Sequence, residues 1–247
     1  MKLATNHSTI NLHPALRGVR AVLFDVGGTL THPDWPRLAS LARDEAGSEF
    51  ESAELERVFK NGLREVDACL KRGEQPPCDT GRRNWTFTLM YGGLGVEDAA
   101  CERLSARLDE IHAERHLWCG IDTDAASVLG ALRQAKILTA AVSNTEDGRL
   151  AELLELIGLG DHFDQQFDSF VVRMRKPDPA IFALALASLG VEPREAAFVG
   201  DSYGHDCLPA LAAGMRAVLI DPLDLHTESV CPRVRSLGEL VGQSAGL

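Results

Sequence analysis

The sequence predicts an α/β protein with a doubly wound parallel sheet and an all-helical insertion. Short apolar runs alternate with helical stretches over residues 119–247, and repeated strand–helix units imply a parallel sheet with helices on both faces. One further apolar run, at residues 20–26, precedes a long segment that shows only helical patterns. We therefore expect an N-terminal arm at 1–19, a core made of 20–32 and 119–247, and a helical domain at 33–118.

The predicted strands of the core are short and mostly apolar. The run at 20–26 (RAVLFDV) has the character of a strand buried on both faces. Later strands are expected in ILTAAVS, FDSFVV, AAFVGD and MRAVLID, the last of these being the final strand. Helices are expected in TDAASVLGALRQAK, EDGRLAELLELIG and DPAIFALALASLG, and from about residue 205 to 214. Thr123 is a candidate N-cap, and Gly158 is a candidate helix end.

Four helical stretches are expected in the insertion, at about 35–46, 50–71, 80–91 and 97–117. The breaks PPCDTG and GGLG separate the last three, and Asp79 in the first break is a candidate N-cap. An aromatic stripe at helical spacing is expected to pack inside this segment: Trp85, Phe87 and Tyr91. Arg82 and Arg83 either face a cleft that receives an anionic substrate or belong to a solvated helix face.

Composition narrows the class of protein. A formal charge of −11 argues against binding the phosphate backbone of nucleic acid. The six cysteines form no CxxC pair, so they predict neither a zinc site nor a disulfide framework and are interpreted as reduced thiols. No apolar run approaches the ~20 residues of a membrane span, and the first residues contain no apolar core of signal-peptide length. We expect a cytoplasmic protein, either a monomer or a homodimer.

Polar residues stand where the predicted strands end. Asp25 ends the first strand, Ser143 ends the next, Lys176 follows FDSFVV, and Asp201 ends AAFVGD with Asp206 shortly after it. Since reactive groups in such sheets gather at the carboxyl ends of strands, the fold would unite residues separated by 118, 33 and 25 positions. A carboxylate nucleophile, hard oxygen ligands for Mg²⁺, and a hydroxyl and an ammonium for phosphoryl oxygens suit phosphoryl transfer.

At this point the sequence resembles the haloacid dehalogenase (HAD) superfamily of hydrolases. Four motifs carry the resemblance, in the family's order: FDVGGTL, AVSNTED, RKPDPAIF, and VGDSYGHD followed by AAGM. Each motif is a weak signal by itself, but the set at these spacings is specific. The likeness extends from RAVLFDVGGTL to RSLGEL, and it implies a Rossmann-like core in which the segment at 33–118 is a cap that closes the site and selects substrates.

The resemblance also implies roles for the motif residues. Asp25 would be the nucleophile that forms an aspartyl-phosphate. Ser143 and Lys176 would bind the phosphoryl group, with Lys176 also steadying Asp25. Thr29 and Asn144 would support the site.

A Mg²⁺ site is implied as well. Asp25 and Asp201 would be direct ligands of the ion, and Asp206 would hold it directly or through water. Gly27 would contribute its backbone carbonyl, a role that needs no side chain. The substrate would be a small phosphorylated metabolite.

Gly27 departs from the pattern of the family's phosphatases, which have an aspartate at this position as general acid and base. Such catalysis is typically worth ~10²–10⁴-fold in rate. A leaving group of low pKa would hardly need the acid, and another residue could replace it. The candidates are His112 and His116 in the insertion and His205 in the last motif, each of which could equally be a surface histidine.

Three other activities are open at this stage. A metal-independent dehalogenase is disfavoured, because the aspartate pair of the last motif indicates a metal. A phosphonatase-like hydrolase of C–P bonds tolerates a small residue at Gly27, but it needs a cap lysine for a Schiff base, and Lys60 and Lys71 lie in a charged helical stretch. A phosphate-binding or regulatory protein with weak catalysis would have no physical need to keep Asp25.

Overall fold

The central sheet is parallel and has six strands. The computed structural model describes residues 10–74 and 85–242. The strands of this sheet are β2 (Ala21–Phe24), β5 (Leu138–Ser143), β6 (Gln165–Asp168), β7 (Ala196–Gly200), β8 (Arg216–Ile220) and β9 (Arg233–Val234). Their order is β6-β5-β2-β7-β8-β9, with every neighbouring pair parallel. The doubly wound parallel sheet predicted from the sequence is thus confirmed.

β2 lies at the centre of this sheet, and the chain winds outward from it in both directions. All four of its residues are fully buried. Val22 and Phe24 point into one apolar cluster, and Ala21 and Leu23 into a second. This alternation follows from the two-residue period of a strand, and burial on both faces explains why no polar residue stands between Arg20 and Asp25.

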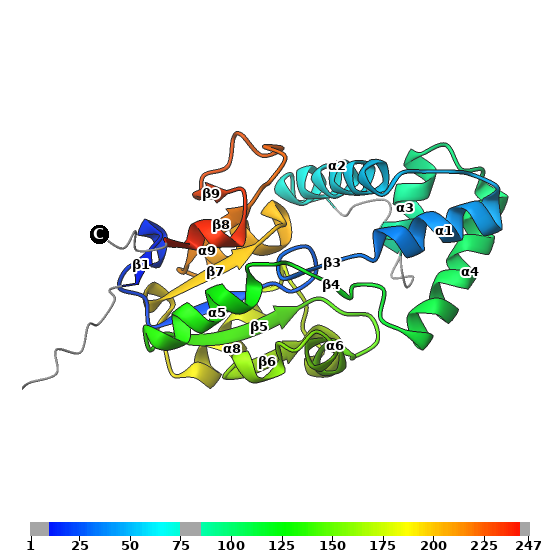
Figure 1. Cartoon of the computed structure of the whole chain (residues 1–247). Coiled ribbons are helices and arrows are strands. Elements are labelled where there is room, and N and C mark those ends of the chain that lie inside the picture. The colour runs from blue at the N-terminus through cyan, green and yellow to red at the C-terminus, as the bar shows by residue number, and fades with distance from the viewer. Residues whose placement is uncertain (1–9, 75–84, 243–247) are drawn as a thin grey trace, which may run out of the picture.

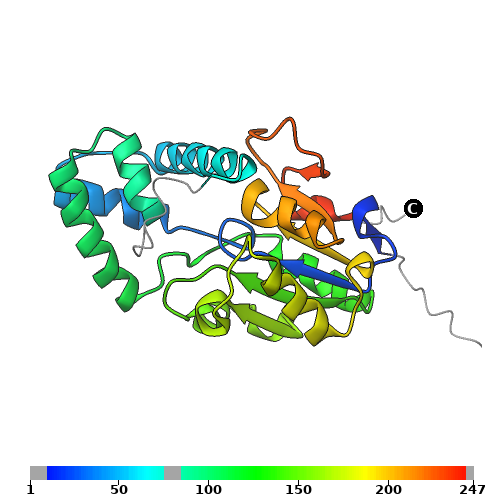
Figure 2. The same ribbon diagram turned by 180° about the vertical axis from the view of Figure 1, so that it is seen from behind.

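Helices cover both faces of the sheet (Figures 1 and 2). On one face, α5 (Ala125–Gln134) and α6 (Leu150–Leu156) pack against the cluster that contains Val22. On the other face, α8 (Pro179–Leu189) and α9 (Leu208–Ala212) pack against the cluster that contains Leu23. The carboxyl ends of the strands therefore meet at one open edge, the usual place for a ligand in a sheet of this kind.

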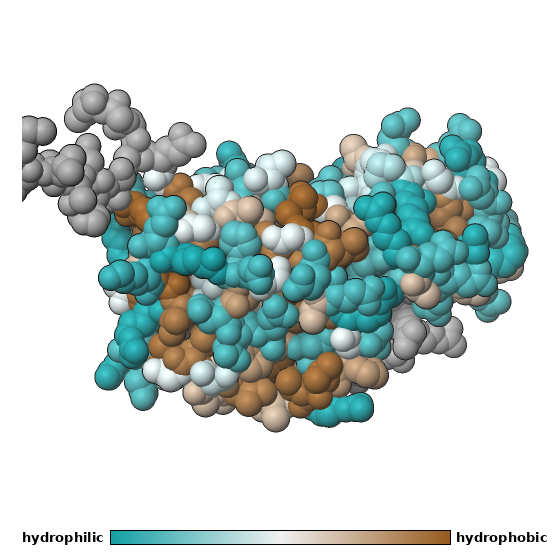
Figure 3. Space-filling view, turned by 60° about the horizontal axis from the view of Figure 1, so that its bottom comes forward, coloured by the Kyte–Doolittle hydropathy of each residue, from teal (hydrophilic) through white to brown (hydrophobic). Residues whose placement is uncertain are grey.

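The insertion forms a helical segment beyond that edge of the sheet (Figure 1). Its helices are α1 (Trp35–Ala46), α2 (Ser52–Lys71), α3 (Trp85–Gly93) and α4 (Asp98–Glu114). They share an apolar cluster of their own, which includes Leu38, Phe59, Phe87 and Leu104. The hydroxyl of Tyr91 is buried here and donates to the Leu38 carbonyl at 2.8 Å. Phe87 and Tyr91 therefore pack inside the segment as expected, whereas Trp85 is only half-buried and lines the cavity described below. Figure 3 shows that one face of this segment is mainly hydrophilic.

Two short strands link the segment to the sheet. β3 (Thr31–His32) enters the segment and pairs antiparallel with β4 (Gly120–Ile121), which leaves it. A Cβ on Gly120 would lie 2.1 Å from ring atoms of His32, so only glycine fits at this crossing. The sequence analysis identified neither strand, because two residues are too short to show a periodic pattern.

Several local predictions are wrong. FDSFVV is not one strand: β6 ends at Asp168, and α7 (Ser169–Val172) follows, because the Asp168 carboxylate accepts from the N–H groups of Phe170 and Val171 and caps a helix. The N-cap of α5 is Asp124 rather than Thr123. The helix expected from residue 205 begins earlier, as a π-helical turn at Tyr203–Cys207 before α9.

The chain also adds strands after MRAVLID, which was expected to be the last. β9 extends the central sheet, and β10 (Val241–Gly242) pairs with β1 (Asn11–Leu12), so part of the expected N-terminal arm is held. Three predictions lie outside the described residues: the cap at Asp79 and the cleft-facing Arg82 and Arg83. Across 10–74 and 85–242, no helix has both the length and the apolar character needed to cross a membrane.

Candidate active site

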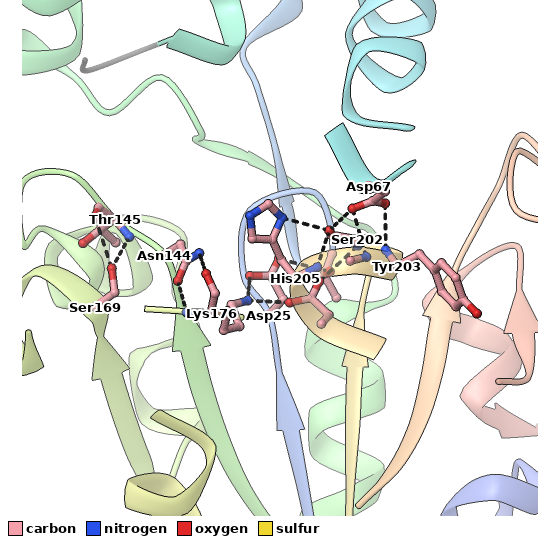
Figure 4. Close-up of polar contacts among 12 residues, drawn as sticks. Asp25, Asp67, Asn144, Thr145, Ser169, Lys176, Ser202, Tyr203 and His205 are labelled. Atoms are coloured by element: carbon pink, nitrogen blue, oxygen red, sulfur yellow. Dashed lines mark hydrogen bonds and ion pairs between the residues drawn. The ribbon is translucent and has the colours of Figure 1, made fainter. Parts of the chain in front are cut away.

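Three strand ends bring the predicted residues together. Asp25 follows β2, and Lys176 enters from the loop before α8 (Figure 4). Ser143 ends β5, and Asp201 follows β7. These four residues and Asp206 line one cavity at the carboxyl edge of the sheet. The sequence therefore identified a real cluster, although its members come from segments far apart in the chain.

Lys176 is the link between two carboxylates. Its Nζ donates to Asp25 Oδ1 at 2.6 Å and to Asp206 Oδ1 at 2.7 Å. The lysine is only 2% exposed, so both ion pairs are shielded from water. Burial opposes the charge on Lys176, but Asp206 and Asp25 outweigh this effect and raise the pKa of the lysine. The ammonium is thus held in its charged form between two anions.

Asn144 fixes the loop that carries Lys176. The Asn144 amide oxygen accepts the N–H of Lys176 at 2.9 Å, and its Nδ2 donates to the Lys176 carbonyl at 2.8 Å. A side chain at the end of β5 thus makes both backbone hydrogen bonds of a residue 32 positions later. On the other side, the Thr29 hydroxyl donates to Asp25 Oδ2 at 3.3 Å. Both expected supporting residues contact the site.

Asp25, Asp201 and Asp206 form a compact acidic cluster. One carboxylate oxygen from each lies within 4.8 Å of the others. Burial raises the pKa of Asp25 to about 6, against the lowering effect of Lys176. Burial and then the charge of Asp25 raise the pKa of Asp201, and burial also raises that of Asp206. Three carboxylates facing one ammonium leave a formal charge of −2, which a divalent cation would balance.

The turn after Asp25 is closely packed against this cluster. Gly28 has φ +93°, and a Cβ built on it would lie 2.0 Å from Asp201 Oδ2, so a side chain is excluded on both counts. Gly27 lines the cavity, and a Cβ on it would lie 3.3 Å from two benzo-ring carbons of Trp118. The space beside Gly27 is therefore already taken by an indole that the sequence analysis did not single out.

The cavity joins the two parts of the molecule and encloses about 200 Å³. Its floor is the polar cluster at the strand ends, and its opposite wall comes from the helical segment. The apolar residues of that wall are Phe59, Leu63, Val66, Trp85, Phe87 and Trp118. Neither Lys60 nor Lys71 lines it. Lys60 pairs instead with Glu56 at 2.7 Å, which removes the structural basis for a Schiff-base lysine.

The three histidines proposed to replace the missing general acid, His112, His116 and His205, all line the cavity. Two of them, His112 and His116, make structural contacts. His112 Nε2 lies 2.9 Å from Asp147 Oδ2, and the Arg149 guanidinium donates to the His112 carbonyl at 2.9 Å. These contacts join the end of α4 to the loop after β5. Burial and the neighbouring His112 lower the pKa of His116 to about 4.

His112, His116 and Asp147 also lie within 4.8 Å of one another, as metal ligands would. However, each histidine accepts a backbone N–H at Nδ1, His112 from Leu117 at 3.3 Å and His116 from Trp118 at 3.2 Å. A ring nitrogen that accepts a hydrogen bond carries no proton, whereas a metal-bound histidine normally donates its second N–H to an acceptor. We assign this group to structural linkage rather than to a metal.

Asp67 of α2 is a site residue that the sequence analysis missed. Its carboxylate accepts from the Ser202 hydroxyl at 2.5 Å and from the N–H groups of Tyr203 and Gly204 at 2.8 and 3.0 Å (Figure 4). Ser202 Oγ also lies 3.2 Å from His205 Nδ1. Nothing in its helix distinguishes Asp67 from a solvated acid, since its partners are about 135 positions away.

Comparisons with known proteins agree with this geometry. A family model described as haloacid dehalogenase-like hydrolase matches residues 19–214. The chain is 31% identical to bovine (Bos taurus) haloacid dehalogenase-like hydrolase domain-containing protein 3, over 90% of this chain and 91% of that protein. It is 29% identical to phosphoglycolate phosphatase 1 of Pseudomonas aeruginosa, over 83% of this chain and 71% of that protein.

Solved structures show the same fold. A HAD phosphatase from Thermococcus onnurineus matches with a TM-score of 0.55 and 27% identity, covering 90% of this chain and 95% of that one. L-2-haloacid dehalogenase from Xanthobacter autotrophicus, with chloropropionic acid covalently bound, matches with a TM-score of 0.59 and 21% identity, covering 90% and 96%. By sequence, fold and the extent of the match, this chain belongs to the haloacid dehalogenase-like hydrolase family.

Proposed function

We propose that the protein is a Mg²⁺-dependent phosphohydrolase that acts on a small phosphorylated metabolite through an aspartyl-phosphate at Asp25. The observation that carries this proposal is the buried arrangement of Asp25, Lys176 and Asp206 at the floor of a cavity of about 200 Å³. The helical segment at 33–118 serves as the cap. Relatives named as phosphoglycolate and phosphoserine phosphatases support this class of reaction.

The chemistry of the acidic cluster suits Mg²⁺. Carboxylate oxygens are the hard ligands that this ion prefers, and the cluster lacks two positive charges. The residues that would hold the ion are Asp25, Asp201 and Asp206, together with the carbonyl of Gly27. When bound, the ion neutralises negative charge on the phosphoryl group and its nucleophile.

Each side chain of the site has its own role in forming the aspartyl-phosphate. One Asp25 oxygen attacks phosphorus, and the carboxylate is oriented for this by Lys176, which donates to Oδ1, and by Thr29, which donates to Oδ2. Lys176 also offers positive charge to the phosphoryl oxygens, and the Ser143 hydroxyl donates to them. Asn144 keeps the lysine loop in place. Water then cleaves the aspartyl-phosphate and restores the Asp25 carboxylate.

Because residue 27 is a glycine, the rate of this enzyme should depend on the pKa of the leaving group. No side chain at that position protonates the departing alcohol or activates the water. The absence of general acid–base catalysis costs ~10²–10⁴-fold for an ordinary alkyl ester. His205 also lines the cavity and is a candidate for a replacement acid.

The location proposed for the protein is the cytoplasm. The described cysteines, Cys69, Cys101, Cys119, Cys207 and Cys231, are free thiols. Free thiols are typical of a reducing compartment, so this observation supports the proposal.

The test is phosphate release from a panel of phosphorylated metabolites, with and without Mg²⁺. Wild type is expected to need Mg²⁺, Asp25→Asn to release no phosphate, and Asp201→Asn to lose the response to Mg²⁺. Asp44→Asn is the matched control, because Asp44 has a 65% exposed side chain on α1. Activity that persists in Asp25→Asn would overturn the covalent route, and activity of wild type without any divalent ion would overturn the metal assignment.

A further inference from the structure

We propose that the preferred substrates are phosphate esters of aromatic alcohols, and that Trp118 binds the aromatic leaving group at the place where Gly27 provides no acid. This inference rests on the proposed phosphohydrolase function and names its substrate class. Its basis is the position of one indole ring relative to the nucleophile's turn.

Trp118 lies directly against the turn that follows Asp25. Its Cε3 and Cζ3 atoms would be 3.3 Å from a Cβ at Gly27, a distance tighter than ordinary van der Waals contact. Even a single Cβ at this position would require the indole to give way by a few tenths of an ångström. The residue two positions after the nucleophile would otherwise reach toward the leaving group, so in this protein an aromatic surface meets the leaving group instead.

Trp118 belongs to a continuous aromatic wall. Its ring centroid lies 5.7 Å from those of Phe59 and Phe87, at interplanar angles of 67° and 38°. These distances are in the range of favourable aromatic pairs, so the neighbours fix the orientation of the indole. All three rings line the cavity together with Leu63 and Val66. These apolar residues form one part of the cap side of the cavity, and polar residues such as His112 and His116 form another part.

The cavity has room for such a leaving group. It encloses about 200 Å³, whereas an engineered apolar cavity of ~150 Å³ binds benzene. Its division into a charged floor and an aromatic wall matches a ligand with a phosphoryl group at one end and a ring at the other. A polyhydroxylated leaving group would instead lose hydrogen bonds to water against this wall.

The same arrangement resolves the chemical problem posed by Gly27. The Asp25 oxygen forms a bond to phosphorus as the P–O bond of the ester breaks, and the electron pair leaves on the aryl oxygen. A phenolate, whose conjugate acid has a pKa of about 10, departs without protonation by the enzyme and takes its proton from water afterwards. In the second step water attacks phosphorus, the Asp25–phosphorus bond breaks, and the protons of that water stay on inorganic phosphate.

Three substrates separate the parts of this proposal. Phenyl phosphate has an aromatic leaving group, cyclohexyl phosphate has an alkyl group of nearly the same size, and acetyl phosphate has a good leaving group without a ring. With Mg²⁺ present, wild type should hydrolyse phenyl phosphate with kcat/KM at least ~100-fold above that for cyclohexyl phosphate, the lower limit of the missing acid's effect. Equal rates for these two esters would overturn the proposal, because they would reveal a replacement acid.

Variants of Trp118 test directly whether its indole binds the leaving group. Trp118→Leu is expected to raise KM for phenyl phosphate about tenfold and to leave KM for acetyl phosphate within about twofold, while Trp118→Phe stays within about threefold of wild type for both. Acetyl phosphate turnover also shows that the variant is folded. Phe170→Leu is the control for an exposed aromatic ring outside the cavity. An equal change for both substrates would contradict a leaving-group site at Trp118.

A binding measurement separates this inference from the proposed function. Phenylphosphonate, which is not hydrolysed, should bind wild type about tenfold more tightly than methylphosphonate in calorimetry, and Trp118→Leu should abolish the difference. If none of the three substrates releases phosphate but this difference is found, the phosphohydrolase function is wrong and the aromatic site stands. If phosphate is released but the difference is absent, the function stands and the aromatic site is wrong.

Discussion

Lys176 Nζ lies 2.6 Å from Asp25 Oδ1, although the two residues are 151 positions apart in the chain. The same ammonium reaches Asp206, so one cation links a carboxylate at the end of β2 with one in the helical turn that follows β7. All three side chains are buried, and under the proposed function the same arrangement would also serve catalysis. Substitution of Lys176 should therefore affect both stability and activity.

Replacing Lys176 by methionine should leave two buried carboxylates without their cation. Removing one partner of a buried ion pair typically costs about 3–5 kcal/mol, so we expect a loss of about 3 kcal/mol in the free energy of unfolding and no detectable phosphate release. Urea unfolding and a phosphate assay measure the two effects. Lys60→Met is the control, since Lys60 is in a partly exposed pair and should change stability by no more than about 0.5 kcal/mol. A stable, active Lys176→Met protein would contradict the account.

Asp67 should hold the helical segment against the last motif. In Asp67→Asn, one carboxylate oxygen becomes an amide donor facing the groups that donate to Asp67 now, Ser202 and the N–H groups of Tyr203 and Gly204. Unsatisfied buried donors cost about 1–3 kcal/mol. Amide hydrogen exchange should therefore accelerate at Tyr203 and Gly204, with no change in the strand residue Leu23. Unaltered exchange at both amides would show that the contact with Asp67 does not stabilise this turn.

Gly28 should tolerate no side chain. In Gly28→Ala the new Cβ would overlap Asp201 Oδ2 and the backbone would keep a strained φ of +93°, so activity should fall at least ~100-fold as Asp201 is displaced. Gly130→Ala is the matched control, because Gly130 is in α5 with open space around its Cα. That substitution should stabilise the protein by about 0.5–1 kcal/mol through helix propensity. Wild-type activity in Gly28→Ala would refute the close packing.

His116 should make the protein sensitive to mild acid. Its pKa is lowered from 6.5 to about 4 because the ring is buried beside His112. Between these values the unfolded chain binds a proton that the folded protein does not, so stability is complete above about pH 6.5 and falls as the pH drops toward 4. The loss from this group is at most about 3 kcal/mol. In His116→Gln, the free energy of unfolding measured with urea should fall less steeply from pH 7 to 4.5 than in wild type. If it falls equally in both, other groups cause the loss of stability.

The residues of the motifs were predictable from the sequence, and the reason is physical. Asp25, Ser143 and Asp201 stand at the ends of apolar runs, and parallel strands bring their carboxyl ends to one edge. Lys176 and Asn144 follow from the same pattern once the family resemblance is noted. Each of these residues can be recognised from the sequence around it, without knowledge of the tertiary structure.

Other features could not be predicted, because their cause lies in distant contacts. Trp118 and Asp67 act through residues about 91 and 135 positions away, and neither stands out in its own helix or loop. FDSFVV reads as a strand by composition, yet the Asp168 side chain caps a helix in its middle. β9 and β10 have two residues each: β9 adds to the edge of the central sheet, and β10 pairs with β1 from the other end of the chain, so both depend on distant partners.

The central claim is that Asp25 becomes covalently phosphorylated during turnover. The most direct test is to quench the enzyme during hydrolysis of phenyl phosphate with Mg²⁺, reduce it with borohydride, and examine the peptide that contains Asp25 by mass spectrometry. An acyl phosphate at this position is reduced to homoserine, so the account predicts that conversion at Asp25 in wild type and none in enzyme treated without substrate. Release of phosphate with Asp25 unchanged throughout would contradict the account.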